Sequence, residues 1–465
     1  MNAVLLIDFG STYTKVTAVD LDTEEIIGTS QSFTTIETDI NDGLNNAVKL
    51  LREKIGDVQF NEQYACSSAA GGLKMVAIGL VPELTAKAAK MASLGAGAKV
   101  MKTYSYQLTE ADLDEIDEIS PDIALLTGGI DGGNKEVIVY NAQMLSKSKK
   151  NFPIVYAGNR NCAATSKEIL DAAGKECYVC ENVMPKLEQP NIEPAQKQIR
   201  EIFLQEIVKA KGLSDAEELI GDILMPTPSA MLTAMKLLAK GTKKEEGIGD
   251  LVGVDLGGAT TDIYSMCQGL PSQSGTVLKG LRETYAKRTV EGDIGMRYSI
   301  KGIVEATDID RVCEISGLDE ARATELINYL SVHTDVVPNG DEELIMLDKA
   351  LASLAIETAV TRHAGHLEQV FTPMGITYMQ LGKDLTQVRK VIVTGGALIR
   401  TEKTAEIAEF ALYNDMQALS LKPKKADILV DRKYILAAMG LLSTNYPEVA
   451  LRIMKKELIK DGNNE

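Results

Sequence analysis

The sequence predicts an α/β protein with two similar lobes and an inserted α/β domain. Three observations lead to this fold class: a glycine hairpin opened by an aspartate occurs twice, the N-terminal residues follow a β-β-β-α order, and short strands alternate with helices from about residue 62 to 185. We expect residues 1–61 and 195–245 to form the first lobe, residues 62–194 the inserted domain and residues 246–465 the second lobe.

The first lobe is predicted to begin with three strands and a helix. Apolar, β-like runs occur at Ala3–Asp8, Thr14–Asp20 and Ile26–Phe33, separated by short turns. The helix is predicted over Asn41–Ile55, where apolar side chains recur at helical spacing. This order of elements is typical of a ribonuclease-H-like lobe.

The turn between the first two strands has a second copy 255 − 8 = 247 residues later. LIDFGSTYTKVT (Leu6–Thr17) aligns within LVGVDLGGATTDIYS (Leu251–Ser265), which places Asp8 on Asp255. Glycines let backbone N–H groups approach an anion, and a strand-end aspartate can hold a hydrated divalent cation. We expect the two lobes to face one ligand, with a polyphosphate between the hairpins and a metal between the two carboxylates. Two unrelated hairpins are the alternative, which the repeat in register disfavours.

The inserted domain is predicted to contain a parallel, doubly wound sheet, because strands alternate regularly with helices. The predicted strands are Tyr64–Ser67, Val100–Ser105, Ile123–Leu126, Ile154–Tyr156 and Cys177–Cys180. The predicted helices lie near Pro82–Leu94, Glu110–Ile116, Gly133–Lys147 and Cys162–Ala173. Glycine turns occur at Ala70–Gly72 and Thr127–Gly133. The second turn follows a strand and could bind an anion or a partner, although a turn that simply requires glycine is the favoured interpretation.

A polar, proline-rich segment, Pro185–Pro194, is predicted as the linker that leaves the inserted domain. A helix is expected near Ala195–Lys211. The motif MPTPSAM (Met225–Met231) ends one segment and starts a helix to about Lys240, and Gly241–Gly249 is a charged link into the second lobe.

The second lobe continues after its hairpin with a mixture of strands and helices. Strands are predicted at Leu270–Leu281, Lys390–Thr394 and Asp427–Val430. Helices are predicted at Asp319–Leu330, Asp341–Phe371, Glu402–Leu412 and Ile435–Leu442. Thr289–Arg297 is predicted as a turn that opens a helix, and the charged tail from Lys455 as frayed.

The composition excludes several classes of function. Of 465 residues, 45% are hydrophobic and 25% charged, which is ordinary for a globular protein. The net charge of −17 argues against general nucleic-acid binding. No secretory leader is visible, and no apolar segment reaches the ~18 residues that a membrane span needs. With six scattered cysteines, these features predict a cytoplasmic protein without a membrane partner.

Two short motifs have a possible metal-binding role and a simpler interpretation. Cys177 and Cys180 form a C-x-x-C pair, for which packed thiols are favoured over a redox or metal site. His363 and His366 are one helical turn apart, with Glu368 near; a polar helix face or an interdomain contact is favoured over a metal site.

Five segments occur in the order LIDFGSTYTK, MPTPSAM, GVDLGGATTD, VIVTGGALIR and ILAAMGLL. They resemble the phosphate-1, connect-1, phosphate-2, adenosine and connect-2 motifs of the actin, sugar-kinase and Hsp70 superfamily. The resemblance implies ribonuclease-H-like lobes of the actin/Hsp70 ATPase type that bind ATP and Mg²⁺. It implies Asp8 and Asp255 as the catalytic, Mg²⁺-facing carboxylates. It implies phosphate or nucleotide contacts from Gly10, Ser11, Thr12, Gly257, Gly258, Thr260, Gly395, Gly396 and Ala397.

Other positions follow from the resemblance less directly. Asp262 matches a second acidic position, Arg400 would flank the base, and Ala437 and Gly440 would be hinge contacts. Lys15 could neutralise phosphate charge or lie on a solvated strand face, and both interpretations stay open.

Connect-1 departs from the Hsp70-like pattern, because Met225 stands where those proteins carry a glutamate that helps to order the attacking water. Asp222 or Glu291 could substitute. The departure favours weak or partner-stimulated ATP hydrolysis and leaves the question of enzymatic activity open.

The chain also resembles, over nearly its full length, the MutL/GlmL accessory proteins of the adenosylcobalamin-dependent glutamate (methylaspartate) mutase, which differ from the DNA-repair proteins of similar name. The resemblance rests on LLIDFGSTYTK, ACSSAAGGLKM, PDIALLTGGIDGGN, VGVDLGGATTDIYS, RTVEGDIGMR and KVIVTGG. It implies a chaperone-like reactivating factor that binds the mutase and uses nucleotide-driven lobe closure to release damaged cobalamin. The inserted domain would dock on the mutase. It lacks the D-x-H-x-x-G pattern of cobalamin binders, so direct cobalamin ligation is not expected.

Three alternatives remain. A small-molecule kinase of the same fold would need a catalytic base aimed at a hydroxyl, and no additional carboxylate motif stands out. An activator of radical dehydratases would need cysteines for a bridging iron–sulfur cluster, which the scattered cysteines do not suggest. A nucleotide-dependent filament would be revealed by sedimentation with and without ATP.

Overall fold

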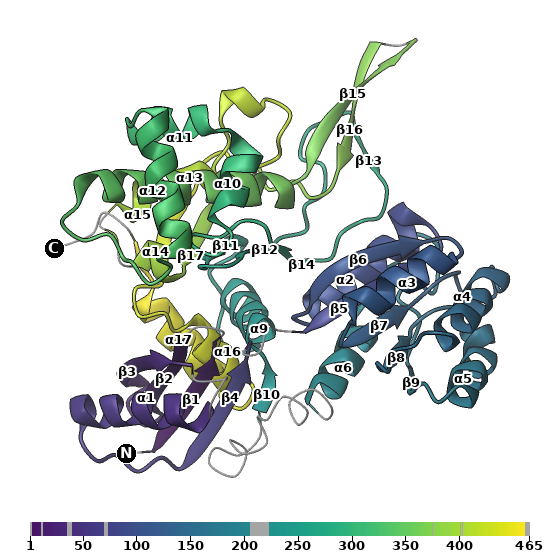
Figure 1. The fold of residues 1–465 in the computed structure, drawn as a ribbon, viewed down its shortest axis with the longest axis horizontal. Coiled ribbons are helices and arrows are strands. Elements are labelled where there is room, and N and C mark those ends of the chain that lie inside the picture. The colour runs from purple at the N-terminus through teal and green to yellow at the C-terminus, as the bar shows by residue number, and fades with distance from the viewer. Residues whose placement is uncertain are drawn as a thin grey trace. The chain divides into compact units, whose positions relative to one another are not determined.

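The chain forms two compact units (Figure 1). The computed structural model describes residues 2–10, 13–34, 40–68, 73–204, 223–373, 375–399, 401 and 403–460. Unit 1 comprises Met1–Ala234, Gly280–Arg282 and Leu436–Ile453, and unit 2 comprises Met235–Lys279, Glu283–Ile435 and Met454–Glu465. Among the helices in these described ranges, none is both long and apolar enough to cross a membrane.

Unit 1 contains the first duplicated sheet, with the strand order β10-β4-β1-β2-β3. Its strands are β1 (Ala3–Phe9), β2 (Tyr13–Asp20), β3 (Glu25–Phe33), β4 (Glu62–Ser67) and β10 (Ile223–Pro226). The first three are antiparallel, whereas β4 is parallel to both β1 and β10. All seven residues of β1 are buried, as expected for a central strand covered on both faces.

Helices cover this sheet. Helix α1 (Ile40–Ile55) buries its apolar stripe, Leu44, Ala47 and Leu51, in the core shared with the sheet. Two helices from the C-terminal part of the chain also belong to this region, α16 (Leu436–Leu442) and α17 (Pro447–Glu457). Between them, Tyr446 Oη donates to Glu62 Oε1 of β4 at 2.6 Å. The predicted β-β-β-α order is therefore confirmed.

The strand β4 corrects one prediction. We assigned the strand near Tyr64–Ser67 to the inserted domain, but it pairs with β1 from Val4↔Glu62 to Phe9↔Ser67 and so belongs to the first sheet. The first strand of the insert is instead β5 (Lys74–Gly79), which we did not predict.

The inserted domain is a five-stranded, fully parallel sheet in the order β6-β5-β7-β8-β9. Its other strands are β6 (Lys99–Ser105), β7 (Ile123–Leu126), β8 (Ile154–Tyr156) and β9 (Cys177–Val179). Alternate residues enter two different cores: Met75 and Ala77 face one, and Val76 and Ile78 the other. Both faces are therefore covered, which confirms the doubly wound prediction.

Helices cover the two faces of the insert sheet. One core includes residues of α2 (Lys87–Gly95), which extends a π-helical turn at Pro82–Ala86, and of α6 (Glu193–Ile202). The other includes residues of α3 (Glu110–Ile119), α4 (Glu136–Ser146) and α5 (Ala163–Ala172), with a 3₁₀ turn at Arg160–Cys162 before α5.

Unit 2 contains the second duplicated sheet, in the order β14-β12-β11-β17-β18-β19. Its strands are β11 (Leu251–Leu256), β12 (Thr261–Met266), β14 (Ala286–Glu291), β17 (Lys390–Thr394), β18 (Asp427–Val430) and β19 (Ile459–Lys460). The first three strands are antiparallel, and β17 is parallel to β11 and β18. The first five strands thus repeat the topology of the unit 1 sheet.

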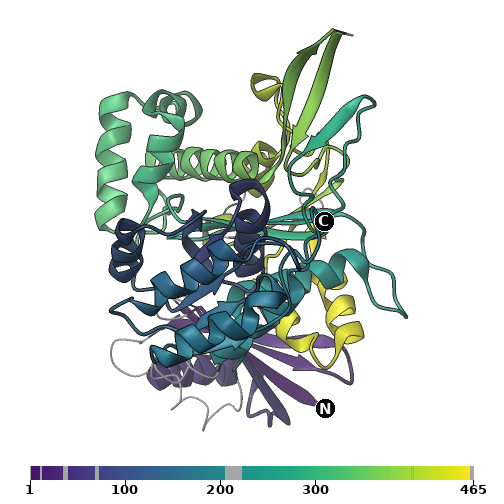
Figure 2. The same cartoon turned by 90° about the vertical axis from the view of Figure 1, so that its right-hand side faces the viewer.

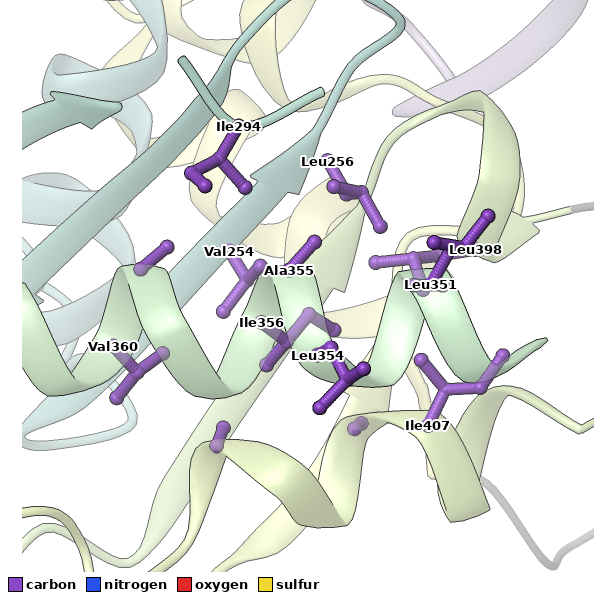
Figure 3. Close-up of a cluster of buried hydrophobic side chains, with 14 of the residues drawn as sticks. Val254, Leu256, Ile294, Leu351, Leu354, Ala355, Ile356, Val360, Leu398 and Ile407 are labelled. Atoms are coloured by element: carbon purple, nitrogen blue, oxygen red, sulfur yellow. The ribbon is translucent and has the colours of Figure 1, made fainter. Parts of the chain in front are cut away.

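A long helix forms the centre of the unit 2 core. Helix α13 (Glu342–His363) buries residues on all sides, and its N-terminus is capped by Asp341. Leu351, Ala355 and Val360 pack with Val254 and Leu256 of β11 (Figure 3). The other helices of the unit are α10 (Ile300–Thr307), α11 (Ile309–Ser316), α12 (Glu320–Val332), α14 (Gly396–Ile399) and α15 (Thr404–Ala408), with 3₁₀ turns at Glu409–Ala411 and Asp415–Gln417.

A three-stranded sheet projects from the helices of unit 2 (Figures 1 and 2). It consists of β13 (Thr276–Lys279), β16 (Gly375–Leu381) and β15 (His366–Thr372). The predicted helix over Asp341–Phe371 was therefore too long. It ends at His363, Ala364 has an extended backbone, and the chain from His366 pairs with β16 as a strand.

Candidate functional site

The first half-site lies at the carboxyl end of β1. Asp8 is directly opposite Lys15 on β2 and beside Cys66 on β4. The turn begins at Gly10, whose N–H donates to the carbonyl oxygens of Asp8 and Tyr13, each at 3.1 Å. A Cβ at Gly10 would lie 2.6 Å from the Tyr13 oxygen, so this tight turn requires glycine.

The buried Asp8 carboxylate is held by three side chains from neighbouring elements. Thr227 Oγ1, at the start of α9 (Thr227–Lys240), donates to Asp8 Oδ1 at 2.6 Å. Cys66 Sγ donates to the same oxygen at 3.5 Å, and burial raises the pKa of this thiol, which keeps it protonated. Lys15 Nζ is 3.6 Å from Asp8 Oδ2. The carboxylate is therefore fixed in direction and paired with one cation.

The second half-site has the same backbone arrangement. Asp255 is the fifth residue of β11, and the Gly257 N–H donates to the Thr260 carbonyl oxygen at 3.0 Å. The N–H groups of Arg297 and Tyr298 both donate to the Gly258 carbonyl oxygen at 2.9 Å. These two hydrogen bonds tie the segment that follows β14 to the glycine turn. The segment therefore holds the turn in place.

The charges differ from those of the first half-site. Across the β11–β12 ladder, Asp255 faces another acid, Asp262. The guanidinium of Arg288, on β14, binds Asp262 Oδ1 at 2.7 Å from Nε and 2.6 Å from Nη2. Arg288 is 5% exposed, so this is a buried ion pair.

The candidate site in unit 2 has a third part, which is the turn after β17. Gly395 has a φ of +105°, and a Cβ there would lie 2.2 Å from the Leu256 carbonyl oxygen. Gly396 is exposed with open space around its Cβ position, and Ala397 is half-buried. The glycine turn therefore lies directly against the end of β11, next to Asp255.

The structure thus brings Asp8, Gly10 and Lys15 together in unit 1. It brings the other described site residues together in unit 2: Asp255, Gly257, Gly258, Thr260, Gly395, Gly396 and Ala397. The predicted residues Ser11, Thr12, Ala70, Gly71, Gly72, Asp222 and Arg400 lie outside the described residues.

Three further predicted positions have different outcomes. Lys15 Nζ lies 3.6 Å from Asp8 Oδ2 and its side chain is 23% exposed, so it does not lie on a fully solvated face, and its contact with phosphate stays a prediction. Glu291 binds Arg362 at 2.9 Å, so its carboxylate is engaged in an ion pair and is a poor substitute for the missing connect-1 glutamate. Gly440 permits close packing of α16 on α9, because a Cβ there would lie 2.0 Å from the Ala230 oxygen.

Three side chains of the half-sites were missed. Thr227 and Cys66 contact Asp8, and Asp431 Oδ2 accepts from Thr394 Oγ1 at 3.2 Å at the end of β17. Thr227 lies within the MPTPSAM motif, which gave a signal that it is near the site. No comparable signal in the sequence indicates that Cys66 or Asp431 lies near the site. Cys66 is brought to Asp8 by the pairing of β4 with β1, and Asp431 follows β18, which pairs with β17.

In the part of the chain that the structure describes, neither the cysteine pair nor the histidine pair is part of a cluster of three or more possible metal ligands. Burial raises the pKa of Cys177 to about 11 and of Cys180 to about 12, which disfavours reactive thiolates and agrees with packed thiols. The buried His363 ring contacts Thr289 Oγ1 and Ser265 Oγ, each at 2.8 Å, so it is a hydrogen-bonded core histidine rather than part of a polar face. His366 lies outside on β15.

The glycine loop of the insert is held by two asparagines. Asn159 Oδ1 accepts from the Gly132 N–H at 3.1 Å, and Asn182 Nδ2 donates to the Gly129 carbonyl oxygen at 3.0 Å. Gly129 and Gly132 have φ values of +70° and +79°. These contacts support the interpretation of Thr127–Gly133 as a turn that requires glycine.

The half-sites fit a nucleotide and a divalent cation in their chemistry. Carboxylate oxygens at strand ends suit Mg²⁺, and glycine turns that a Cβ would fill let a ligand approach the backbone. Within the described residues, no cluster of three or more His, Cys, Asp or Glu side chains forms a self-contained metal site. Each half-site offers a small number of oxygen ligands, as expected where phosphate oxygens and water complete the shell of Mg²⁺.

The comparisons with known proteins decide the family. The MutL protein family matches residues 4–458. The chain belongs to this family. It is 50% identical over 462 residues to Protein MutL of Clostridium tetanomorphum, covering 99% of this chain and 100% of that one.

Among solved structures, this member of the MutL family is similar to gluconate kinase from Lactobacillus acidophilus, with 10% identity, coverage of 99% and 92%, and a TM-score of 0.37. It is also similar to a nucleotide-free diol dehydratase-reactivating factor, with 11% identity, coverage of 96% and 99%, and a TM-score of 0.36. Scores this low carry no argument about function. The architecture is established by the strand orders of the two sheets themselves.

Proposed function

We propose that this MutL-family protein is an ATP-binding, chaperone-like reactivating factor for an adenosylcobalamin-dependent glutamate mutase. It promotes the release of damaged cobalamin through nucleotide-driven lobe closure. The observation that carries the proposal is the duplicated Asp–Gly hairpin, which occupies the equivalent strands of two sheets with the same topology. Family membership supports the choice of partner.

We propose Asp8 and Asp255 as the Mg²⁺-facing carboxylates and the glycine turns as the nucleotide contacts. Phosphoryl chemistry depends mainly on positioning and charge stabilisation, which fixed carboxylates and backbone donors supply. When bound, Mg²⁺ would neutralise phosphate charge. Thr227 fixes the direction of Asp8, and Lys15 adds a cation. Met225 at connect-1 supports slow or partner-stimulated hydrolysis.

The inserted domain is the proposed docking element for the mutase. Cobalamin-binding domains are also doubly wound parallel sheets, and the all-parallel order β6-β5-β7-β8-β9 supports a surface that imitates such a subunit. A chain that lacks the insert should keep ATP binding and lose mutase binding. Intact mutase binding after the deletion would defeat this part of the proposal.

The direct experiment uses the full chain and purified glutamate mutase that is inactive because its bound cobalamin is damaged. We expect co-purification of the two proteins to depend on ATP or ADP, and Mg-ATP with fresh adenosylcobalamin to restore mutase activity. Neither effect should appear with the Asp255→Ala variant. Failure of the wild-type chain to bind Mg-ATP, or to restore activity when bound, would refute the proposal.

A small-molecule kinase remains the alternative, but the described carboxylates beside the half-sites do not favour it. Asp262 binds Arg288, and Glu291 binds Arg362. Each of these carboxylates already accepts hydrogen bonds from a guanidinium, so neither is placed to take a proton from the hydroxyl of a bound substrate.

A further inference from the structure

The first turn of α9 contacts two separate parts of unit 1. Thr227 Oγ1 donates to Asp8 Oδ1 at 2.6 Å, which links α9 to the first half-site. Two residues later, Ser229 Oγ donates to the Ala96 carbonyl oxygen at 2.8 Å, which links α9 to the inserted domain just after α2. The connect-1 motif is therefore a junction between the proposed nucleotide site and the proposed docking domain.

The contact with the insert is tight. Ser229 is 1% exposed. Gly97 has a φ of +95°, and a Cβ there would lie 2.9 Å from Pro226 Cβ and 3.0 Å from Ser229 Oγ. A close-packed contact of this kind leaves little space between the first turn of α9 and the backbone of Ala96 and Gly97.

Helix α2 extends from this junction toward the other end of the insert. Its buried face, including Ala88 and Ala92, belongs to the core beneath the insert sheet. In the π-helical turn before α2, Thr85 Oγ1 accepts from the N–H groups of Leu80 and Val81, at the carboxyl end of β5. The helix therefore joins the α9 junction to the end of the sheet where doubly wound folds present their loops.

We propose that Thr227 and Ser229 are positioning residues that couple Mg-nucleotide binding at Asp8 to the position of α2 in the inserted domain. The inference rests on the proposed function. It adds a route by which nucleotide binding at this site would regulate docking by the inserted domain. Asp8 would hold a bound Mg²⁺ with the same carboxylate that accepts from Thr227 Oγ1, so this hydrogen bond would weaken on binding. The resulting shift of the first α9 turn is transmitted through Ser229 to Ala96.

The test is hydrogen–deuterium exchange of the full chain with and without the non-hydrolysable probe Mg-AMPPNP. The amides of residues 96–99 are hydrogen-bonded and report on this junction. We expect the probe to change their exchange in the wild-type chain and in Thr227→Ser, which keeps the hydroxyl. Thr227→Val should lose most of that change. Thr233→Val is the matched control, because Thr233 Oγ1 donates to the Ser229 carbonyl oxygen within α9 and should leave the change intact.

A second variant keeps the inference testable if Thr227→Val binds the probe poorly. Ser229→Ala leaves the partners of Asp8 in place, so we expect near wild-type affinity for Mg-AMPPNP with loss of the exchange change at residues 96–99. Persistence of the change in Ser229→Ala would overturn the coupling. A wild-type chain that binds the probe without any change there would overturn the coupling alone, whereas a chain that does not bind the probe would overturn the proposed function as well.

Discussion

The two half-sites share a backbone and differ in their charges. At the position opposite the strand-end aspartate, unit 1 has Lys15 and unit 2 has Asp262. The Asp8–Lys15 pair sums to no net charge. Asp255, Asp262 and the buried Arg288 sum to one negative charge, −2 + 1 = −1. The two half-sites thus share one turn geometry, and the side chains around it give the unit 2 half-site the stronger attraction for a cation.

The largest expected effect is on Mg-nucleotide binding. Asp255→Ala should weaken Mg-ATP binding at least about 100-fold, because a charged ligand interaction in a partly buried site is worth roughly 2–5 kcal/mol. Asp8→Ala should weaken it less, since Lys15 already neutralises Asp8. Isothermal titration measures both affinities, and thermal unfolding checks that each variant folds. Equal losses in the two variants would break the comparison.

The next effect is on stability. Arg288→Met should lower the free energy of unfolding by about 3–5 kcal/mol, because it leaves Asp262 without its buried guanidinium partner. Lys15→Met should cost less, about 1–2 kcal/mol, because the Lys15 side chain is 23% exposed and Asp8 keeps its hydrogen bond from Thr227. Urea denaturation of the two variants provides the measurement. A loss for Lys15→Met as large as that for Arg288→Met would show that the first pair is not the weaker one.

The two glycines after β17 should differ in their tolerance of a side chain. Gly395 has no room for a Cβ, whereas Gly396 has open space around that position. Gly395→Ala should destabilise unit 2 by about 2–4 kcal/mol, because its backbone has a positive φ and the Cβ would collide with the Leu256 oxygen. Gly396→Ala should change stability by no more than about 0.5 kcal/mol, because nothing lies within 4 Å of its Cβ position. Melting temperatures of the two variants, compared with the wild type, test this contrast.

Acid should also distinguish the units, because all three histidines, at positions 333, 363 and 366, belong to unit 2. Burial, with Lys287 and Lys383 nearby, lowers the pKa of His363 well below its usual 6.5. Below pH 6.5 the unfolded chain binds a proton there that the folded chain does not. Stability should therefore fall as the pH drops, with a slope from this residue that is about half of 1.4 kcal/mol per pH unit at pH 6.5 and approaches the full value about one unit lower.

The measurement for His363 is denaturation between pH 7 and pH 5.5. His363→Gln will be less stable at neutral pH, because it disturbs the contacts with Thr289 and Ser265. The slope of its stability against pH should nevertheless be smaller than that of the wild type, by a difference that approaches one proton at pH 5.5. The same slope in both proteins would show that the imidazole is protonated in the folded state.

Local patterns predicted the duplicated elements well. The apolar runs Ala3–Asp8 and Lys390–Thr394 became β1 and β17, and the helix over Asn41–Ile55 became α1. Strands with continuous apolar runs and turns that need glycine are determined by neighbouring residues, so a sequence contains the required information.

Other elements depended on distant partners. The segment after His363 was predicted as helix, but it forms β15, because β16 offers a strand to pair with. The strand β4 was assigned to the wrong sheet for the same reason: its own sequence favours a strand, and its pairing with β1 is decided elsewhere in the chain.

By itself, the sequence determined the family, the two Asp–Gly hairpins and the alternation that builds the insert, because these depend on residues a few positions apart. The tertiary structure decided which groups surround each aspartate. Thr227 and Cys66 reach Asp8 from 219 and 58 residues away, and Arg288 reaches Asp262 from the next strand. Such contacts arise only when strands pair and side chains from separate elements share one buried space, which no local pattern encodes.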